Sequence, residues 1–460
     1  MRSFDLKPTK ENLIENLKED SLGRNRLIYR FIQLLLSIQD ATTISIDGKW
    51  GSGKTFFVKQ PKLILEAYNS NFKIPNNDDE SDDINEKDIE QIKTIMSCID
   101  KDFFDETLVN NPQVVVYYDA WENDDKIDPV LSLIFRIVES INENFDIKID
   151  FKIFDNIPGF KNLVSTIKDL KSIVKFNILL KEQEQNINLK QQIKYFLNFI
   201  LNERGNKLII LIDELDRCSP SYAVKILERI KHYFDDDRII FVFSTHLSQL
   251  THTIKKFYGE GYNSYEYLNR FFNIKCTLPK IDIENYCKNI EFFDSEHIIN
   301  DISKKIIKKY DLSLRQINKF YTLLKISSFN IKNKEYRFKN EKGQFFYIAF
   351  INTLIITLNI IDGEKYNNLI NGMDSSIFID WLLYIYNDEF KYFFNDLLFE
   401  NKSNPENVND KFKDIYTAVF IEEYTTKNQI IIGDMIFDSE IKSLIQNTTN
   451  LLSDFSYFGD

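Results

Sequence analysis

Apolar and polar positions recur with two different periods over the first 280 residues. Five short runs are rich in β-branched and aromatic residues, and they cover residues 42–47, 113–119, 207–213, 238–245 and 271–278. Such runs are typical of strands that are buried on both faces. Between the runs, apolar residues recur with the 3.6-residue period of a helix. This alternation predicts an α/β fold with a parallel five-stranded sheet covered by helices on both faces.

The same patterns divide the chain into four predicted regions, which are residues 1–40, 41–280, 281–330 and 331–460. The first is a helical lead-in. The second holds the five strands and encloses a long, mainly helical insertion at residues 128–204. The third is a helical, lid-like subdomain, and the fourth is an α-helical domain. We interpret the many aromatic side chains of the fourth region as core residues, with a partner-docking groove as the alternative.

The composition limits the classes of protein to which the chain can belong. Apolar residues make up 43% of the 460 positions, which is enough for a large core. The net charge of −12 disfavours a nucleic-acid partner, although a local basic patch is compatible with it. The four cysteines are widely spaced, which favours a reducing cytoplasm over a zinc site or a disulfide framework. Polar residues interrupt the most apolar run, residues 345–361, so we expect a buried helix and no membrane span.

The octapeptide from Gly48 to Thr55 carries the clearest chemical signal. It reads GKWGSGKT, which is the P-loop pattern G-x-x-x-x-G-K-[ST], and it holds three of the 13 glycines of the chain. The loop joins a predicted strand to a predicted helix. In that context backbone N–H groups surround the phosphates of a nucleotide, and the lysine reaches the outer ones. The predicted nucleotide-binding residues are Gly48, Trp50, Gly51, Ser52, Gly53, Lys54, Thr55 and Phe56.

A pair of acidic residues provides the second signal. Asp213 ends the apolar run 207–213, and Glu214 follows it. Ligands of open α/β sheets bind at the carboxyl ends of the strands, which is where both acids are expected. We predict that Thr55 and Asp213 hold Mg²⁺, that Lys54 acts on the outer phosphates, and that Glu214 is the general base for an attacking water. Together these residues predict Mg²⁺-dependent hydrolysis of ATP.

Four further residues allow two interpretations each. Thr245 ends the fourth run, where it either senses the γ-phosphate or belongs to a capped turn. Arg270 and Arg315 are candidates for the arginine that stabilises charge during phosphoryl transfer, or they are helix residues that face water. Arg217 either pairs with Asp216 or contacts a neighbouring subunit.

These motifs together resemble those of the KAP family of P-loop NTPases. The similar segments are, in chain order, residues 20–24 (DSLGR), 48–55, 119–122 (DAWE), 213–220 (DELDRCSP), 267–279 and 314–320. The segment DELDRCSP is the most specific of them. The resemblance covers about residues 20–325, and the remainder of the chain resembles nothing that we can name.

The resemblance implies the P-loop NTPase fold with an additional catalytic glutamate and the sheet order 5-1-4-3-2. It also implies ATP and Mg²⁺ as ligands, and a homo-oligomer that assembles through the nucleotide face. Many members insert transmembrane helices between the P-loop and the acidic motif. Here charged residues interrupt the insertion throughout, so membrane anchoring is not expected. Bacterial members often act in anti-phage defence or plasmid exclusion, which is the expected biological context.

The leading hypothesis is an ATP-hydrolysing switch or motor subunit. The alternative is a nucleotide-gated interaction module with slow or no turnover, whose C-terminal helical region binds a partner protein. A kinase for a small molecule is disfavoured, because Glu214 suits the activation of water and no arginine-rich lid follows the fourth run.

Overall fold

The computed structural model of the chain forms two compact units, Lys7–Ile281 and Asp282–Asp460. It describes residues 7–73, 84–124, 129–145, 204–290, 298–332, 341–386, 390–399, 407–424 and 428–454, together with residues 194, 197, 198 and 201. Most of the predicted insertion at residues 128–204 therefore lies outside the described residues.

A five-stranded parallel sheet forms the centre of the first unit. Its strands are β1 (Thr42–Asp47), β2 (Gln113–Asp119), β3 (Lys207–Asp213), β4 (Ile239–Thr245) and β5 (Ile274–Thr277). They are arranged in the order β2-β3-β4-β1-β5. The predicted fold and the order 5-1-4-3-2 are therefore confirmed. β5 is shorter than the run at 271–278, because Phe271 belongs to the preceding helix and the edge strand alternates between half-buried and exposed positions.

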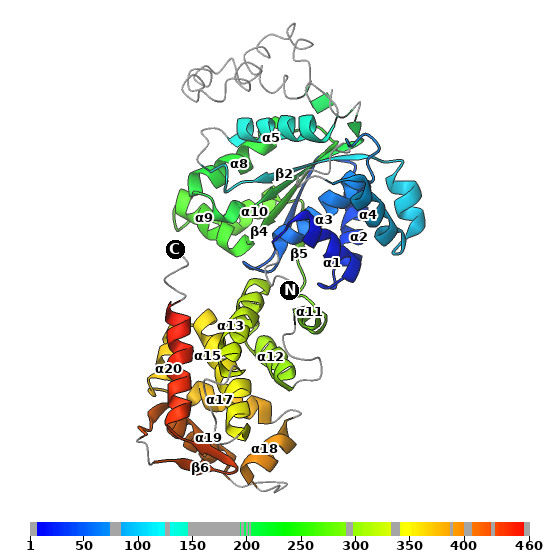
Figure 1. Cartoon of the computed structure of the whole chain (residues 1–460). Helices are drawn as coiled ribbons and strands as arrows, with labels where there is room; N and C mark the ends of the chain where they lie inside the picture. The colour runs from blue at the N-terminus through cyan, green and yellow to red at the C-terminus, as the bar shows by residue number, and fades with distance from the viewer. Residues whose placement is uncertain are drawn as a thin grey trace. The chain divides into compact units, whose positions relative to one another are not determined.

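Helices cover both faces of this sheet (Figure 1). The helices on one face are α1 (Lys10–Glu19), α2 (Asn25–Ser37), α3 (Lys54–Ala67) and α4 (Glu86–Ser97). Those on the other face are α5 (Pro129–Asn144), α8 (Pro220–Tyr233), α9 (Leu247–Tyr258) and α10 (Ser264–Phe271). The second group shares one apolar core with side chains of β2, β3 and β4, among them Tyr118, Ile212 and Phe243.

The register of the sheet aligns the carboxyl ends of four strands. Asp119 lies opposite Asp213, Asp213 lies opposite Ser244, and Thr245 lies opposite Asp47. Because all these strands are parallel, the segments that follow them emerge at the same edge of the sheet. That edge is where ligands bind in open α/β folds.

The second unit is mainly helical. Its helices are α11 (Ile283–Ile290), α12 (Ile298–Lys309), α13 (Leu314–Lys332), α14 (Glu341–Phe346), α15 (Thr353–Ile361), α16 (Gly363–Ile370), α17 (Ser376–Tyr386), α18 (Lys391–Phe399), α19 (Val408–Tyr416) and α20 (Ser439–Asp454). Aromatic side chains fill its core, where Phe350 lies 5.0 Å from Phe346 and 5.1 Å from Phe394 between ring centroids. The indole of Trp381 is fully buried and donates a hydrogen bond to the Phe350 carbonyl oxygen (3.0 Å).

A hairpin adds two short strands to residues 331–460, which we predicted to be an α-helical domain. β6 (Ile430–Ile432) and β7 (Met435–Phe437) pair in antiparallel fashion around a turn at Gly433. Gly433 has a left-handed backbone (φ 58°), and a Cβ there would lie 2.2 Å from the Leu397 carbonyl oxygen. The signal was present in the sequence as an isoleucine run followed by Gly-Asp, which favours a two-residue hairpin turn. Three-residue strands are too short to show an alternating pattern, so the helical pattern of the neighbouring residues led to a helix prediction here.

The stretch Lys342–Ile361 is long and apolar enough to cross a membrane by length and composition alone. However, 67% of its most apolar window is buried inside the protein. Its polar side chains also have partners there: the hydroxyls of Thr353 and Thr357 donate to carbonyl oxygens one turn earlier, and the Asn352 amide donates to Ser327 (2.8 Å). These hydrogen bonds provide partners for polar groups that are buried inside the protein.

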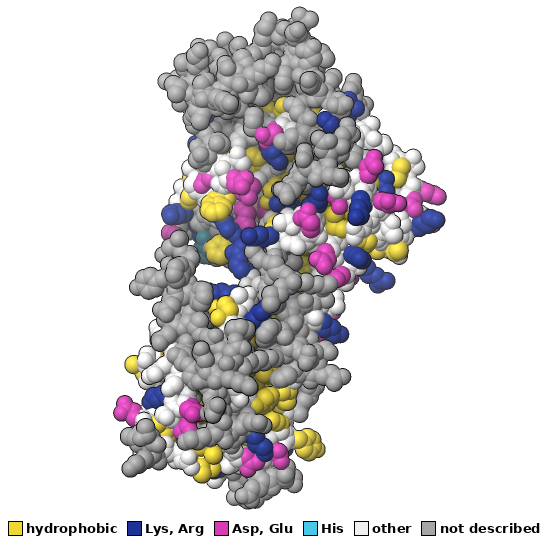
Figure 2. Space-filling model, in the orientation of Figure 1, with side chains coloured by type: hydrophobic (Ala, Val, Ile, Leu, Met, Phe, Trp, Pro, Cys, Tyr) yellow, Lys and Arg dark blue, Asp and Glu magenta, His cyan; other side chains and the backbone are white. Residues whose placement is uncertain are grey.

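Charged side chains of both signs are interspersed on the molecular face that Figure 2 shows.

Candidate functional site

The P-loop turns sharply between β1 and α3, and its glycines make this possible. Gly51 (φ 74°) and Gly53 (φ 84°) have left-handed backbones, which side chains with a Cβ disfavour. Gly48 is restricted by space instead, because a Cβ there would lie 2.7 Å from the Ser52 Oγ. The loop thereby ends on the first turn of α3, whose free N–H groups attract anions.

Lys54 is buried within this loop. Its Nζ donates hydrogen bonds to the carbonyl oxygens of Gly48 (2.7 Å) and Lys49 (3.4 Å). Burial lowers the pKa of Lys54, whereas the charges of nearby acids, Asp216 and Asp213 foremost, raise it. The lysine therefore lies between the loop and the acidic ends of the neighbouring strands.

Asp213 is the most deeply buried of these acids, with 1% of its surface exposed. Its carboxylate accepts hydrogen bonds from the Glu214 backbone N–H (3.0 Å) and the Tyr117 hydroxyl (3.1 Å). Burial raises the pKa of Asp213, and the adjacent hydroxyls of Thr55 and Ser244 counteract that rise. The hydroxyl of the P-loop threonine and the carboxylate that ends β3 thus lie beside each other.

Glu214 follows Asp213 with a left-handed backbone (φ 59°). Its carboxylate forms an ion pair with Arg217, with 2.5 Å between Oε2 and the arginine Nε. Burial and the charge of Asp213 raise the pKa of Glu214 to about 7, although Arg217 lowers it. A carboxylate with a pKa near 7 is suited to take a proton from water at neutral pH. Arg217 therefore pairs with Glu214, and not with Asp216, which was one of its two predicted alternatives.

Asp216 instead joins the P-loop to the end of β4. The Trp50 Nε1 donates to one of its carboxylate oxygens (2.5 Å), and the Thr245 hydroxyl donates to the other (2.9 Å). The backbone N–H of Gly48 also donates to the Thr245 carbonyl oxygen (3.3 Å). Asp216 and Thr245 are buried, whereas Trp50 is half-exposed, so the network runs from the surface of the P-loop into the protein. Sequence reasoning missed the Trp50–Asp216–Thr245 network, because spacing alone does not show which side chains meet.

The other predicted site residues lie in different surroundings. Phe56 is buried in the core beside the P-loop, with 4% of its surface exposed. Arg270 is exposed on α10 and forms an ion pair with Glu266. Arg315 is exposed on α13 and belongs to the second unit. The structure thus brings together Trp50, Lys54, Thr55, Asp213, Glu214 and Thr245.

Arg24 is a further residue of this region whose role sequence reasoning missed. Only 3% of its surface is exposed, and burial lowers its pKa to about 10. Its guanidinium donates to the carbonyl oxygens of Ser52 in the P-loop (3.1 Å) and Pro279 after β5 (2.9 Å). The only signal in the sequence was that Arg24 ends the segment DSLGR.

The loop after β2 packs against the acidic motif. One Asp119 carboxylate oxygen accepts from the Trp121 backbone N–H (3.0 Å), and Asp124 accepts from the backbone N–H and hydroxyl of Ser219 (2.8 Å each). The ring of Trp121 faces the guanidinium of Arg217, with 5.6 Å between the arginine Cζ and the ring centroid. The loop is thus fixed at both ends and holds an aromatic ring beside the Glu214–Arg217 pair.

These residues fit a nucleotide with a divalent cation. The Ser52 Oγ is buried without a hydrogen-bond partner in the described part of the chain, and a phosphate oxygen would supply one. The Thr55 hydroxyl and the Asp213 carboxylate are oxygen ligands of the kind that Mg²⁺ prefers, with the rest of its shell from water and phosphate. Within the described ranges, no group of three or more His, Cys, Asp or Glu side chains could hold a metal ion by itself.

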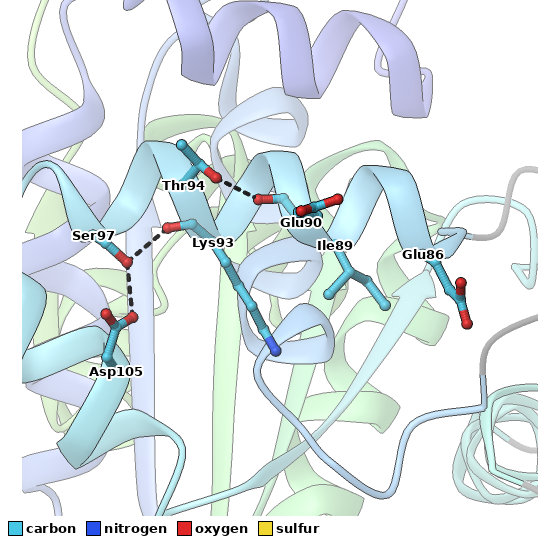
Figure 3. A pocket seen from close by; sticks show the side chains of 7 residues that line it. All are labelled: Glu86, Ile89, Glu90, Lys93, Thr94, Ser97 and Asp105. Carbon is cyan, nitrogen blue, oxygen red and sulfur yellow. Dashed lines mark hydrogen bonds between the residues drawn. The ribbon is translucent and has the colours of Figure 1, made fainter.

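A groove of about 700 Å³ lies elsewhere in the first unit, on α4 and the π-helical turn Phe103–Leu108. Its lining residues are Glu86, Ile89, Glu90, Lys93, Thr94, Ser97 and Asp105 (Figure 3). Three carboxylates against one ammonium disfavour a phosphate ligand. The Ser97 and Thr94 hydroxyls are also hydrogen-bonded within the groove. None of its lining residues belongs to the P-loop or the strand ends, so we do not assign it to the site.

Comparison with known proteins supports the interpretation of the motifs. The profile of the KAP family P-loop domain matches residues 24–358, which include every predicted site residue. A search of curated proteins found no match.

Two solved structures show a distant likeness. The Aeropyrum pernix ORC2 protein in ADPNP-ADP complexes is 11% identical with a TM-score of 0.33, over 94% of this chain and 93% of that chain. Drosophila ORC bound to poly(dA/dT) DNA and Cdc6 is 10% identical with a TM-score of 0.33, over 97% of this chain and 63% of that chain. Scores this low support no argument about this chain.

Proposed function

The chain belongs to the KAP family of P-loop NTPases, and on that premise we propose that it hydrolyses ATP with Mg²⁺ as a switch or motor subunit. Binding of a nucleotide follows from the family. The observation that carries the proposal of hydrolysis is the position of Glu214. This carboxylate, whose pKa is raised to about 7, directly follows the buried Asp213 and lies near the P-loop lysine.

The residues of the P-loop bind and orient the triphosphate. The Lys54 ammonium, which donates to carbonyl oxygens of its own loop, would donate to the outer phosphates. Thr55 and Asp213 would hold Mg²⁺, which neutralises phosphate charge when bound. The Trp50–Asp216–Thr245 network fixes the loop against the ends of β3 and β4, so the phosphates are held at a constant distance from Glu214.

Glu214 acts as the general base for water. The water oxygen forms a bond to the γ-phosphorus, and the bond between that phosphorus and the bridging oxygen breaks. ADP keeps the electron pair of the broken bond, and the proton of the water moves to the Glu214 carboxylate. The products are ADP and inorganic phosphate.

Substitution of Glu214 by Gln tests this mechanism. Glutamine keeps the size of the side chain but takes no proton, so kcat should fall by about 10²–10⁴-fold while ATP affinity stays within about threefold. Glu266→Gln is the control, because it changes an exposed glutamate on α10 in the same way. Unchanged steady-state turnover in Glu214→Gln would refute the mechanism.

A nucleotide-gated interaction module is the second candidate, and the Glu214–Arg217 ion pair favours it. A base that is already paired with a cation is less available to water, which fits slow turnover. Purified protein that binds ATP but releases no phosphate, alone or with its partner, would support this candidate over the first.

The family resemblance also leads us to propose assembly as a homo-oligomer through the nucleotide face. Trp50 and Trp121 support this proposal, because 47% and 55% of their surfaces are exposed at the carboxyl edge of the sheet. The mass of the particle in solution, measured with and without ATP and Mg²⁺, tests it.

The family resemblance supports three further proposals. They are a cytoplasmic location, a protein partner on the second unit, and a role in defence against phage or plasmids. The identity of the neighbouring genes would test the role in defence.

A further inference from the structure

The Glu214–Arg217 pair is built into the local fold. Leu215–Arg217 forms a single 3₁₀ turn, and the Arg217 backbone N–H donates to the Glu214 carbonyl oxygen (3.1 Å). Glu214 precedes this turn with a left-handed backbone (φ 59°). The guanidinium of Arg217 lies beside its carboxylate, with 2.5 Å between Nε and Oε2.

Trp121 holds the other side of the arginine. Its ring faces the guanidinium at 5.6 Å, an arrangement in which the negative face of the indole attracts the cation. The loop that carries Trp121 is fixed by Asp119 at its start and by Asp124 at its end. Only 27% of the Arg217 side chain is exposed, so its charge is partly shielded from water.

This arrangement makes the Glu214 carboxylate a poorer acceptor for a proton of water. Arg217 contacts Oε2 and leaves Oε1 without this contact, but its charge stabilises the negative charge that both oxygens share. A charge-assisted hydrogen bond is roughly twice as strong as a neutral one. Departure of the guanidinium would therefore make the carboxylate more available to water.

We propose that Arg217 is a positioning residue that holds the Glu214 carboxylate in a resting state, and that the Trp121 ring keeps Arg217 in place. This inference rests on the proposed function, because it concerns the availability of the same base. Turnover of ATP is then limited by release of Arg217, and a partner that displaces Trp121 would raise turnover without contacting the nucleotide.

The test compares Arg217→Gln and Trp121→Ala with the unchanged chain under the same conditions. We expect kcat to rise about three- to tenfold in Arg217→Gln, and less in Trp121→Ala, with the Kd for ATP unchanged within twofold. Trp121→Phe should keep kcat near its original value, because phenylalanine still offers a ring face. A merely structural role would lower kcat or weaken binding in all three variants.

Glu139→Gln is the control. Glu139 forms an ion pair with Arg136, also three residues away in sequence and at 2.6 Å, on α5. The Arg136 Nε keeps its hydrogen bond to the Tyr117 carbonyl oxygen (3.3 Å) in this variant. Loss of the ion pair should change neither kcat nor Kd. A kcat that stays equal or falls in a folded Arg217→Gln variant would overturn the inference. Trp121 is exposed, so Trp121→Ala should fold even if Arg217→Gln does not. A kcat that stays equal or falls in Trp121→Ala would then overturn the inference.

Failure of this inference is distinguishable from failure of the proposed function. If Glu214→Gln is inactive but Arg217→Gln is no faster, only the resting-state role of Arg217 is wrong. If Glu214→Gln retains turnover, the general base is wrong and the role of Arg217 falls with it. The double variant should be as inactive as Glu214→Gln alone.

Discussion

At the residue scale, the partners of buried charged groups determine what those groups can do. Asp213, Asp216 and Arg24 are all more than 90% buried, yet each has a different set of partners. The sequence predicted Lys54, Thr55, Asp213 and Glu214, because phosphate chemistry requires these residue types at this spacing. The partners of Arg217 and Asp216 could not be predicted from the sequence. The Arg217 pair depends on the left-handed backbone of Glu214. The Asp216 hydrogen bonds depend on how the P-loop, the loop after β3 and the end of β4 come together in the fold.

We expect Trp50→Phe to weaken nucleotide binding by about three- to tenfold. The variant leaves the buried Asp216 carboxylate without its indole donor. Loss of a hydrogen bond to a charged group costs about 1.5–3 kcal/mol when it is fully buried, and less here because Trp50 is half-exposed and water can replace the donor. Titration with a fluorescent ATP analogue measures the affinity. The variant should also have a lower Tm than the unchanged chain. Trp121→Phe is the control, since the Trp121 ring is exposed at the same edge and faces Arg217 rather than Asp216. Equal affinities in the two variants would contradict the role assigned to Asp216.

Arg24 should be replaceable by Lys only in part. Its guanidinium reaches two carbonyl oxygens at once, in Ser52 and Pro279, whereas an ammonium is a single point of charge. We expect Arg24→Met to weaken ATP binding by about tenfold and Arg24→Lys to lie between it and the unchanged chain. Calorimetric titration with ATP measures all three. Identical affinities in the three proteins would show that the P-loop keeps its shape without this residue.

At the scale of elements, burial on both faces made the central strands predictable. The bounds of β1, β2 and β3 and of α3 agree with the patterns in the sequence, because a strand or helix in a core cannot vary its apolar positions. The edge strand β5 was predicted too long and the β6–β7 hairpin was missed. Both are short and partly exposed, so their side chains carry little of the pattern.

Lys207 links two elements, and its loss should destabilise the first unit. Its Nζ donates to the carbonyl oxygens of Leu35 (3.1 Å), Leu36 (2.7 Å) and Ile38 at the end of α2. Carbonyl groups at a helix C-terminus lack partners within the helix. We expect Lys207→Met to lower the free energy of unfolding by about 1–3 kcal/mol, measured by urea denaturation. Lys225→Met on α8, where the lysine is exposed, should change it by less than about 0.5 kcal/mol.

At the scale of the whole molecule, the predicted nucleotide site lies almost wholly in one of the two units. All the predicted site residues except Arg315 lie in Lys7–Ile281. The contacts that fix the P-loop, from Arg24, Asp216 and Thr245, are internal to the same unit. The second unit has its own aromatic core and contributes no residue to these contacts in the described part of the chain.

We therefore expect a fragment of residues 1–281 to bind ATP with a Kd within about threefold of the whole chain. At an ATP concentration of 100 Kd, binding should stabilise both proteins by about 2.7 kcal/mol, which appears as a rise in Tm. Circular dichroism shows whether the fragment is folded, and Lys54→Ala in the fragment should abolish the rise in Tm.

If the folded fragment binds but hydrolyses no ATP, Arg315→Ala in the whole chain shows whether that arginine is needed for hydrolysis. A folded fragment without a thermal shift would mean that the second unit completes the nucleotide site.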